Sequence, residues 1–175
     1  MNMLLHDVRE SLAQTPRIIE GLIAAAPAEA LSFREADGAW HVVEVLCHVA
    51  DGEITDWMPR IERILSDGGR FMPFDREGGF ARYRGWTAEA LVGEFGQLRR
   101  ANLEKLDSFG LENAHMRMTG IHPEFGEVTL EQLIACWVTH DMAHIAQISR
   151  LLTRSFGRRV GPWRKYFSLL QEGQS

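Results

Sequence analysis

The sequence predicts an all-α protein, a four-helix bundle with a long crossover connection and a short C-terminal helix. Four stretches carry apolar residues at the spacing of an amphipathic helix, and none shows the sustained apolar-polar alternation that marks a large sheet. Two connections of about 20 residues exceed the usual length of about two to eight between antiparallel neighbours. Because long connections allow consecutive helices to run parallel, a simple up-down-up-down order is not expected.

The first predicted helix spans about Leu4–Ala26, and Pro16 inside it is expected to kink or divide it. The second spans about Trp40–Leu65, where Gly52 and Pro59 are possible points of bending. Both stretches keep apolar residues at helical spacing over most of their length.

The third predicted helix spans about Ala88–Phe109 and has Thr87 as its N-cap. The fourth begins after Thr129 and ends near Leu152; the run Thr129-Leu-Glu-Gln132 fits a capping box, which satisfies two free backbone N–H groups. A short helix over Trp163–Leu170 is expected to follow Gly161-Pro162.

The two long connections run from Ser66 to Trp86 and from Gly110 to Val128. Within them, Phe71–Phe74 and Gly120–Gly126 are each compatible with a short hairpin or with coil. Long loops in a compact domain are often functional.

Composition and charge limit the classes of partner. The 175 residues fit one domain over 1–175, and 45% hydrophobic with 25% charged residues is ordinary for a soluble globular protein. A net charge of -5 gives no general attraction to nucleic acid or to anionic membranes. No apolar run approaches the roughly 20 residues that cross a bilayer.

The N-terminus and the cysteines indicate a cytoplasmic protein. Asp7, Arg9 and Glu10 interrupt the first apolar residues, unlike a signal peptide. Cys47 and Cys136 lie within helical patterns and form no disulfide framework.

His140 and His144 are the most informative pair of residues. They lie one helical turn apart beside the apolar stripe of the fourth predicted helix, so both rings point the same way. Two imidazoles so placed can bind one transition metal if a third ligand arrives from elsewhere. From the pair alone, a metal site and a hydrogen-bonded core pair are equally supported.

His48 favours the metal site. It lies among valines on the second predicted helix, and bundle metal sites are built from inward side chains of facing helices. Three protein ligands, His48, His140 and His144, would leave one position open for water or substrate, as in catalytic metal sites.

Other side chains near these histidines have several possible roles. Glu44, one turn before His48, could be a fourth ligand, an acceptor for a ring N–H, a general base or a solvated glutamate. Asp51 and Asp141 could orient ligands or balance charge. Cys136, one turn before His140, could approach a metal, but it is interpreted as a small buried core residue. The loop at His122-Pro123 could cover the mouth of the site, but it is interpreted as a structural turn before the fourth helix.

The run His140-Asp-Met-Ala-His144 also resembles the zinc-peptidase pattern His-Glu-x-x-His. That mechanism needs a carboxylate that reaches the metal-activated water. Asp is one methylene shorter than Glu, so a peptidase is disfavoured.

Three segments in order resemble the DinB-like (DinB/YfiT) superfamily, a group of proposed metalloenzymes. They are Trp40–Asp51 with His48, the stretch from His122 through Trp137-Val-Thr-His-Asp-Met-Ala-His-Ile-Ala-Gln-Ile148, and Gly161-Pro-Trp-Arg-Lys-Tyr166. The resemblance covers essentially the whole chain.

The resemblance implies a four-helix bundle with a long crossover and a divalent ion, zinc or nickel, held by His48, His140 and His144. Family members are often dimers, so a homodimer is expected. Some branches are S-transferases or isomerases that use a low-molecular-weight thiol such as bacillithiol or mycothiol. The resulting hypothesis is a metal-dependent enzyme, a thiol S-transferase or a hydrolase, acting on a small molecule. The alternative is a non-catalytic metal-binding or stress-response bundle.

Overall fold

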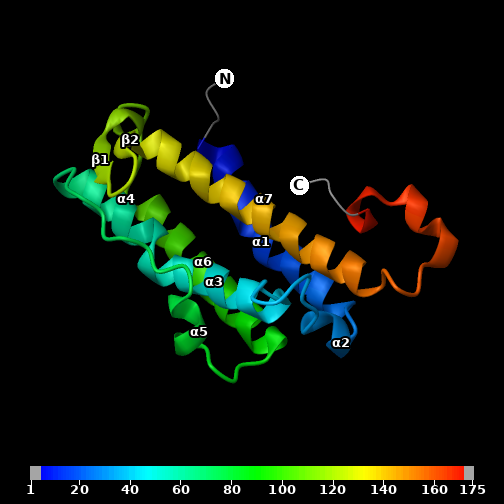
Figure 1. Ribbon diagram of the computed structural model, residues 1–175. Helices are drawn as coiled ribbons and strands as arrows, with labels where there is room; N and C mark the ends of the chain where they lie inside the picture. The colour runs from blue at the N-terminus through cyan, green and yellow to red at the C-terminus, as the bar shows by residue number, and fades with distance from the viewer. Residues whose placement is uncertain (1–4, 172–175) are drawn as a thin grey trace.

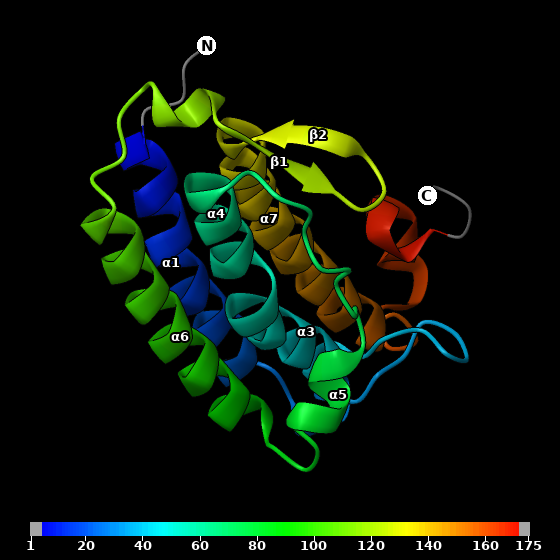
Figure 2. The same cartoon turned by 90° about the vertical axis from the view of Figure 1, so that its left-hand side faces the viewer.

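Long helices packed side by side make up the body of the protein (Figures 1 and 2). The structure, a computed structural model, describes residues 5–171. The predicted all-α bundle is confirmed. It has four long helical segments, called rods below, and one of them consists of two consecutive helices. The rods are α1 (Leu5–Ala24), α3 (Val42–Thr55) with α4 (Trp57–Ser66), α6 (Ala88–Ser108) and α7 (Leu130–Ser155).

The direction of the helices confirms that the order is not up-down-up-down. The α3–α4 rod and α6 run parallel, because Arg99 of α6 pairs with Glu53 and, further along both rods, Lys105 pairs with Glu62. Residues 67–87, which contain the short helix α5 (Gly78–Arg82), form the crossover that returns the chain to the start of α6 (Figure 2). α7 runs antiparallel to α3.

Two helices differ in detail from the prediction. α1 continues through Pro16 as one helix, and the expected start at Leu4 lies outside the described residues. The second predicted helix is divided at Asp56, whose ψ is -71°, and α4 begins at the next residue, Trp57. Pro59 is the third residue of α4 and has no N–H to bond the carbonyl of Thr55, which explains the division at this point.

The predicted helix caps are present. The Thr87 side chain accepts a hydrogen bond from Ala90 N, and Thr129 and Gln132 form both bonds of the capping box that begins α7. A second capping box, not predicted from the sequence, begins α3: His41 accepts from Glu44 N, and the Glu44 carboxylate accepts from His41 N.

The two predicted long connections carry short elements. The second forms a 3-10 turn, η1 (His115–Arg117), and the hairpin of β1 (Thr119–His122) and β2 (Gly126–Thr129), which lies at the start of α7 (Figure 1). The first long connection, residues 66–86, pairs with this hairpin at one point, where Phe71 N donates to Ile121 O at 2.9 Å. A short helix not predicted from sequence, α2 (Ala28–Leu31), follows α1.

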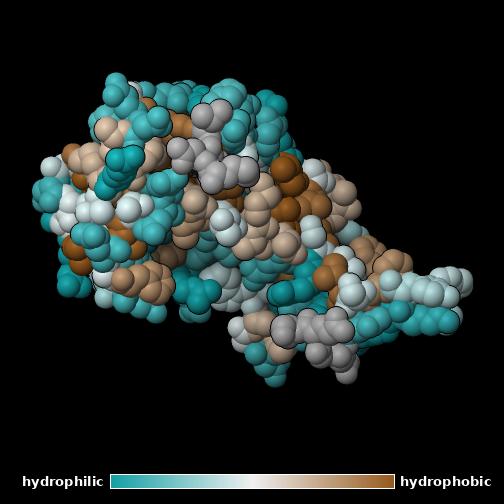
Figure 3. Space-filling view, turned by 90° about the horizontal axis from the view of Figure 1, so that it is seen from above, coloured by the Kyte–Doolittle hydropathy of each residue, from teal (hydrophilic) through white to brown (hydrophobic). Residues whose placement is uncertain are grey.

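The C-terminal helix was predicted as one helix and is instead two 3-10 turns, η2 (Gly161–Tyr166) and η3 (Ser168–Leu170). Phe167 between them has an extended backbone, which interrupts the helix and separates the two turns. This segment projects from the bundle (Figures 1 and 3) and exposes Trp163 and Tyr166 by 64% and 69%. Within residues 5–171 no helix is both long enough and apolar enough to cross a membrane.

The core consists of two apolar clusters separated by a polar layer. One cluster packs around Phe95 and Ile148, the other around Trp137 and Leu12. Between them, near the middle of the rods, four buried polar residues lie close together, one from each rod. These residues, called the polar layer below, are Thr15 of α1, Glu53 of α3, Arg99 of α6 and Asp141 of α7.

Candidate metal centre

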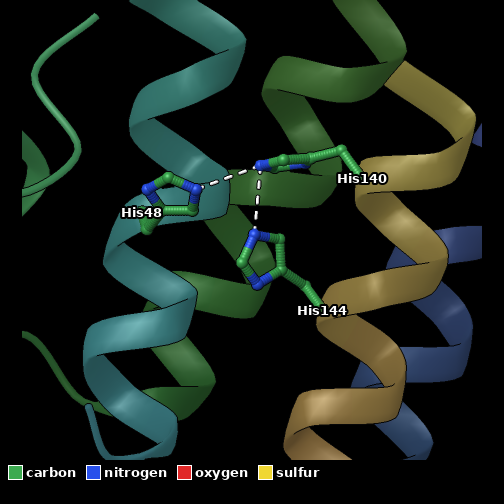
Figure 4. Close-up of side chains that lie close together, drawn as sticks. All are labelled: His48, His140 and His144. Atoms are coloured by element: carbon green, nitrogen blue, oxygen red, sulfur yellow. Dashed lines mark hydrogen bonds between the residues drawn. The ribbon is translucent and has the colours of Figure 1, made fainter. Parts of the chain in front are cut away.

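Three histidines from two facing helices converge next to the polar layer (Figure 4). His48 projects from α3, and His140 and His144 project from successive turns of α7. The Nε2 atom of His140 lies 3.0 Å from Nε2 of His48 and 3.1 Å from Nε2 of His144. All three ligand atoms lie within 4.8 Å of one another. The structure therefore brings together every histidine that the sequence predicted as a ligand.

Hydrogen bonds at the far side of two rings determine their tautomers. His48 Nδ1 lies 3.0 Å from the backbone carbonyl oxygen of Arg76, and His144 Nδ1 lies 2.8 Å from Oε1 of Gln147. Because these oxygens only accept, each Nδ1 carries the proton and each Nε2 presents a lone pair. Both lone pairs point toward the same space, next to Nε2 of His140.

The electrostatics of the site favour neutral rings. Burial, together with the neighbouring histidines, lowers the pKa of His48 to about 4 and that of His144 to about 3. At neutral pH both rings are therefore uncharged and able to act as ligands.

This arrangement fits a divalent transition metal. At most one proton on His140 Nε2 can be shared with the two facing lone pairs, so the nitrogens cannot all be satisfied by one another. Three neutral imidazole nitrogens from His48, His140 and His144 are the donor set that suits zinc or nickel, and a three-ligand site leaves a coordination position for another group.

Aromatic side chains surround the histidines. The ring of Trp40 lies 5.1 Å from that of His48, and Phe74 lies 5.4 Å from it on the crossover. On the other side, Trp57 lies 5.0 Å from His140. Such an apolar surround lowers the local dielectric and strengthens the interaction of an ion with its ligands.

Glu44 does not join the three histidines. Its two carboxylate oxygens each lie 2.7 Å from the guanidinium of Arg34, and one also accepts from His41 N at 2.9 Å. The carboxylate is thus used to begin α3 and to join it to the preceding loop. None of the roles expected from sequence describes this position, because Glu44 caps α3 and pairs with Arg34.

The remaining candidates take structural positions. Asp51 pairs with Arg82 of α5 at 2.6 Å, and Asp141 pairs with Arg99 in the core. Cys136, interpreted from sequence as buried, is exposed. His122 Nδ1 accepts from Glu124 N and Phe125 N at 3.2 Å, which confirms a structural turn.

Two groups at the site were not identified from sequence. Gln147 lies three residues after His144 on the same helix, a spacing that brings the two side chains together, so a signal was present. The Arg76 carbonyl has no such signal, because it is a backbone group 28 residues from His48 on a loop whose path depends on the whole fold.

Comparison with known proteins agrees with this architecture. A family model described as the DinB superfamily matches residues 11–148. A solved structure of YfiT from Bacillus subtilis, described as a probable metal-dependent hydrolase with an unusual four-helix bundle topology, superimposes with a TM-score of 0.73. The two chains are 21% identical, and the match covers 86% of each. No curated protein sequence matches this chain. With its helical bundle and most of its length covered by the family model, this chain belongs to the DinB superfamily.

Proposed function

We propose that the protein is a divalent-metal-dependent enzyme that holds zinc or nickel on His48, His140 and His144. The observation that carries this proposal is the convergence of three Nε2 atoms, two of them with their protons directed away by Arg76 and Gln147. A core pair of histidines would satisfy its own hydrogen bonds, whereas these rings leave lone pairs facing one another.

The proposed reaction is hydrolysis of a small molecule or transfer of a low-molecular-weight thiol to one. A divalent ion with an open position supplies Lewis acidity and lowers the pKa of a water or a thiol, giving a nucleophile at neutral pH. Support comes from the three-ligand set and from the similar fold of YfiT, itself described as a probable metal-dependent hydrolase. The chain's own residues orient the ligand rings and, through Trp40, Phe74 and Trp57, limit the access of water.

Metal analysis tests the site. Untagged wild-type protein is expected to bind about one equivalent of zinc or nickel, and His140→Ala/His144→Ala none. His122→Ala, which changes a histidine in the hairpin turn, is the matched control and should bind as wild type does. Equal metal content in the wild type and the double variant would show that the site is wrong.

Activity assays then separate an enzyme from a non-catalytic bundle. The metal-loaded protein is tested against ester, amide and phosphoester substrates and against electrophiles supplied with a thiol. Turnover that is lost in the double histidine variant and retained in His122→Ala supports the proposal. Metal binding that raises the melting temperature without any turnover supports the non-catalytic alternative. Homodimerisation and a cytoplasmic location stay predictions; light scattering after size-exclusion chromatography tests the first.

A further inference from the structure

A buried ion cluster lies directly behind the candidate metal centre. Arg99 of α6 stands between Glu53 of α3 and Asp141 of α7, and all three are at most 2% exposed. Its guanidinium donates to both oxygens of Glu53 at 3.1 and 2.8 Å and to both oxygens of Asp141 at 2.6 and 3.0 Å. A further bond of 2.8 Å goes to Leu12 O of α1, so one side chain joins four helices.

The cluster carries an excess negative charge. Two carboxylates face one guanidinium, which leaves a formal charge of about -1 inside the bundle. Trp137 Nε1 and Asn102 Nδ2 also donate to Glu53, at 3.2 and 3.0 Å, but these neutral groups do not cancel the charge. A buried net charge is costly unless a charge of opposite sign lies close by.

His140 connects this cluster to the three converging nitrogens. Its Nδ1 atom is buried and has no hydrogen-bond partner among the described residues, unlike Nδ1 of His48 and of His144. The facing carboxylate atom is Oδ1 of Asp141, at 4.0 Å, which is an electrostatic contact about 1 Å longer than a hydrogen bond. When Nε2 of His140 acts as a ligand, Nδ1 keeps its proton and needs an acceptor.

We propose that the Glu53–Arg99–Asp141 cluster is the counter-charge and orienting support of the metal centre. In this arrangement Asp141 accepts a hydrogen bond from His140 Nδ1, and the excess negative charge of the cluster offsets the positive charge of the ion. The inference rests on the proposed function, because it requires that the three histidines bind a cation. Asp141 and Glu53 are positioning residues that act through His140.

The cluster also explains why Asp141 does not serve as a general base of the zinc-peptidase kind. Both of its oxygens are held by Arg99, so the carboxylate faces the core and not the space between the three Nε2 atoms. A cluster that only tied the helices together would leave metal affinity unchanged when its charge is altered.

The test compares metal affinity in variants that alter charge and keep shape. Asp141→Asn is expected to weaken zinc binding by about 10–100-fold, the usual loss when the acceptor behind a histidine ligand is removed. Cobalt substitution supplies a second readout, because a reoriented His140 ring shifts the visible spectrum of bound cobalt. Glu35→Gln is the matched control. The Glu35 carboxylate pairs with Arg150 and Arg154 near the C-terminal end of α7, so its replacement should leave zinc affinity unchanged.

Glu53→Gln is the second variant, and it tests the role of the cluster in metal binding if Asp141→Asn does not fold. It keeps the Asp141 carboxylate but removes the excess charge, so zinc binding should weaken relative to Glu35→Gln. Melting temperatures of the metal-free proteins measure the purely structural cost. Unchanged zinc affinity in either folded variant, with a lowered melting temperature, overturns the proposal. If wild type itself binds no metal, the proposed function fails; if wild type binds and the variants bind equally well, this inference alone fails.

Discussion

Replacing the buried Arg99 by methionine should destabilise the protein more than a single change at the surface or at a helix cap. The change removes five N–H groups that bond Glu53, Asp141 and the carbonyl of Leu12, and it leaves two carboxylates facing each other in the core. Removing one partner of a buried ion pair typically costs about 3–5 kcal/mol. For a chain of this length, each kcal/mol lowers the melting temperature by about 2–4 °C, so a fall of about 6–20 °C is expected.

Urea denaturation followed by circular dichroism measures this cost. Arg150→Met is the control, because Arg150 pairs with Glu35 but its side chain is 42% exposed, and exposed pairs contribute about 0–1 kcal/mol. The dependence of the unfolding free energy on urea should be equal in both variants, which shows that the same surface is exposed on unfolding. A loss for Arg99→Met within about 1 kcal/mol of that for Arg150→Met would refute the assignment of an uncompensated charge to the core.

Three further predictions concern the ion, the capping box of α3 and the crossover. Zinc returned to metal-free protein at 100 times its dissociation constant should stabilise it by about 2.7 kcal/mol, and a melting temperature independent of zinc would contradict the site. Burial raises the pKa of Glu44, but the hydrogen bonds and charges of Arg34 and His41 together lower the pKa below its usual value. Glu44 therefore stabilises the fold above its unfolded pKa of about 4.3, and this stability is lost as the pH falls further. Glu44→Gln should therefore be less stable at pH 7 and lose less stability between about pH 5 and 3; equal slopes would count against the ion pair. Gly79→Ala should lower both the melting temperature and zinc affinity, because the added Cβ would meet the carbonyl oxygen of Cys47 and push α5 away from α3. Gly93→Ala, where the added Cβ has open space, is the control.

The sequence predicts that the three histidines come together because the signals for this are local. His140 and His144 need only one helix to point the same way, and the capping box of Thr129 and Gln132 establishes where that helix begins. His48 could be added because bundle helices bring their apolar faces together. None of these steps depends on the path of a loop.

The features that the sequence did not predict depend on contacts between distant segments. The acceptor for His48 Nδ1 is the carbonyl of Arg76, which any residue type would supply, so no side chain marks it. Bending at Pro59 was expected and the second helix is divided next to it, whereas Pro16, also expected to kink or divide its helix, does not divide α1. Whether a proline breaks a helix depends on the packing on either side, which single-helix patterns do not contain.

The polar layer had a sequence signal that becomes clear only when the helices are placed together. Arg99 interrupts an apolar series at a spacing of four, between Phe95 and Leu103, and Asp141 does the same between Trp137 and Ile145. A charged residue at such a position must be buried and paired, or the helix must turn it to solvent. The partners cannot be assigned from sequence, because pairing depends on which helices run parallel.

The polar layer also determines the register of the helices along the bundle axis. Sliding α7 along the bundle by one turn, about 5.4 Å, would move Asp141 away from Arg99 and into an apolar cluster, leaving charges unpaired on both helices. The same slide would separate His140 and His144 from His48. Because the cost of unpairing Arg99 opposes any such shift, the charge layer maintains the register in which the three histidines face one another.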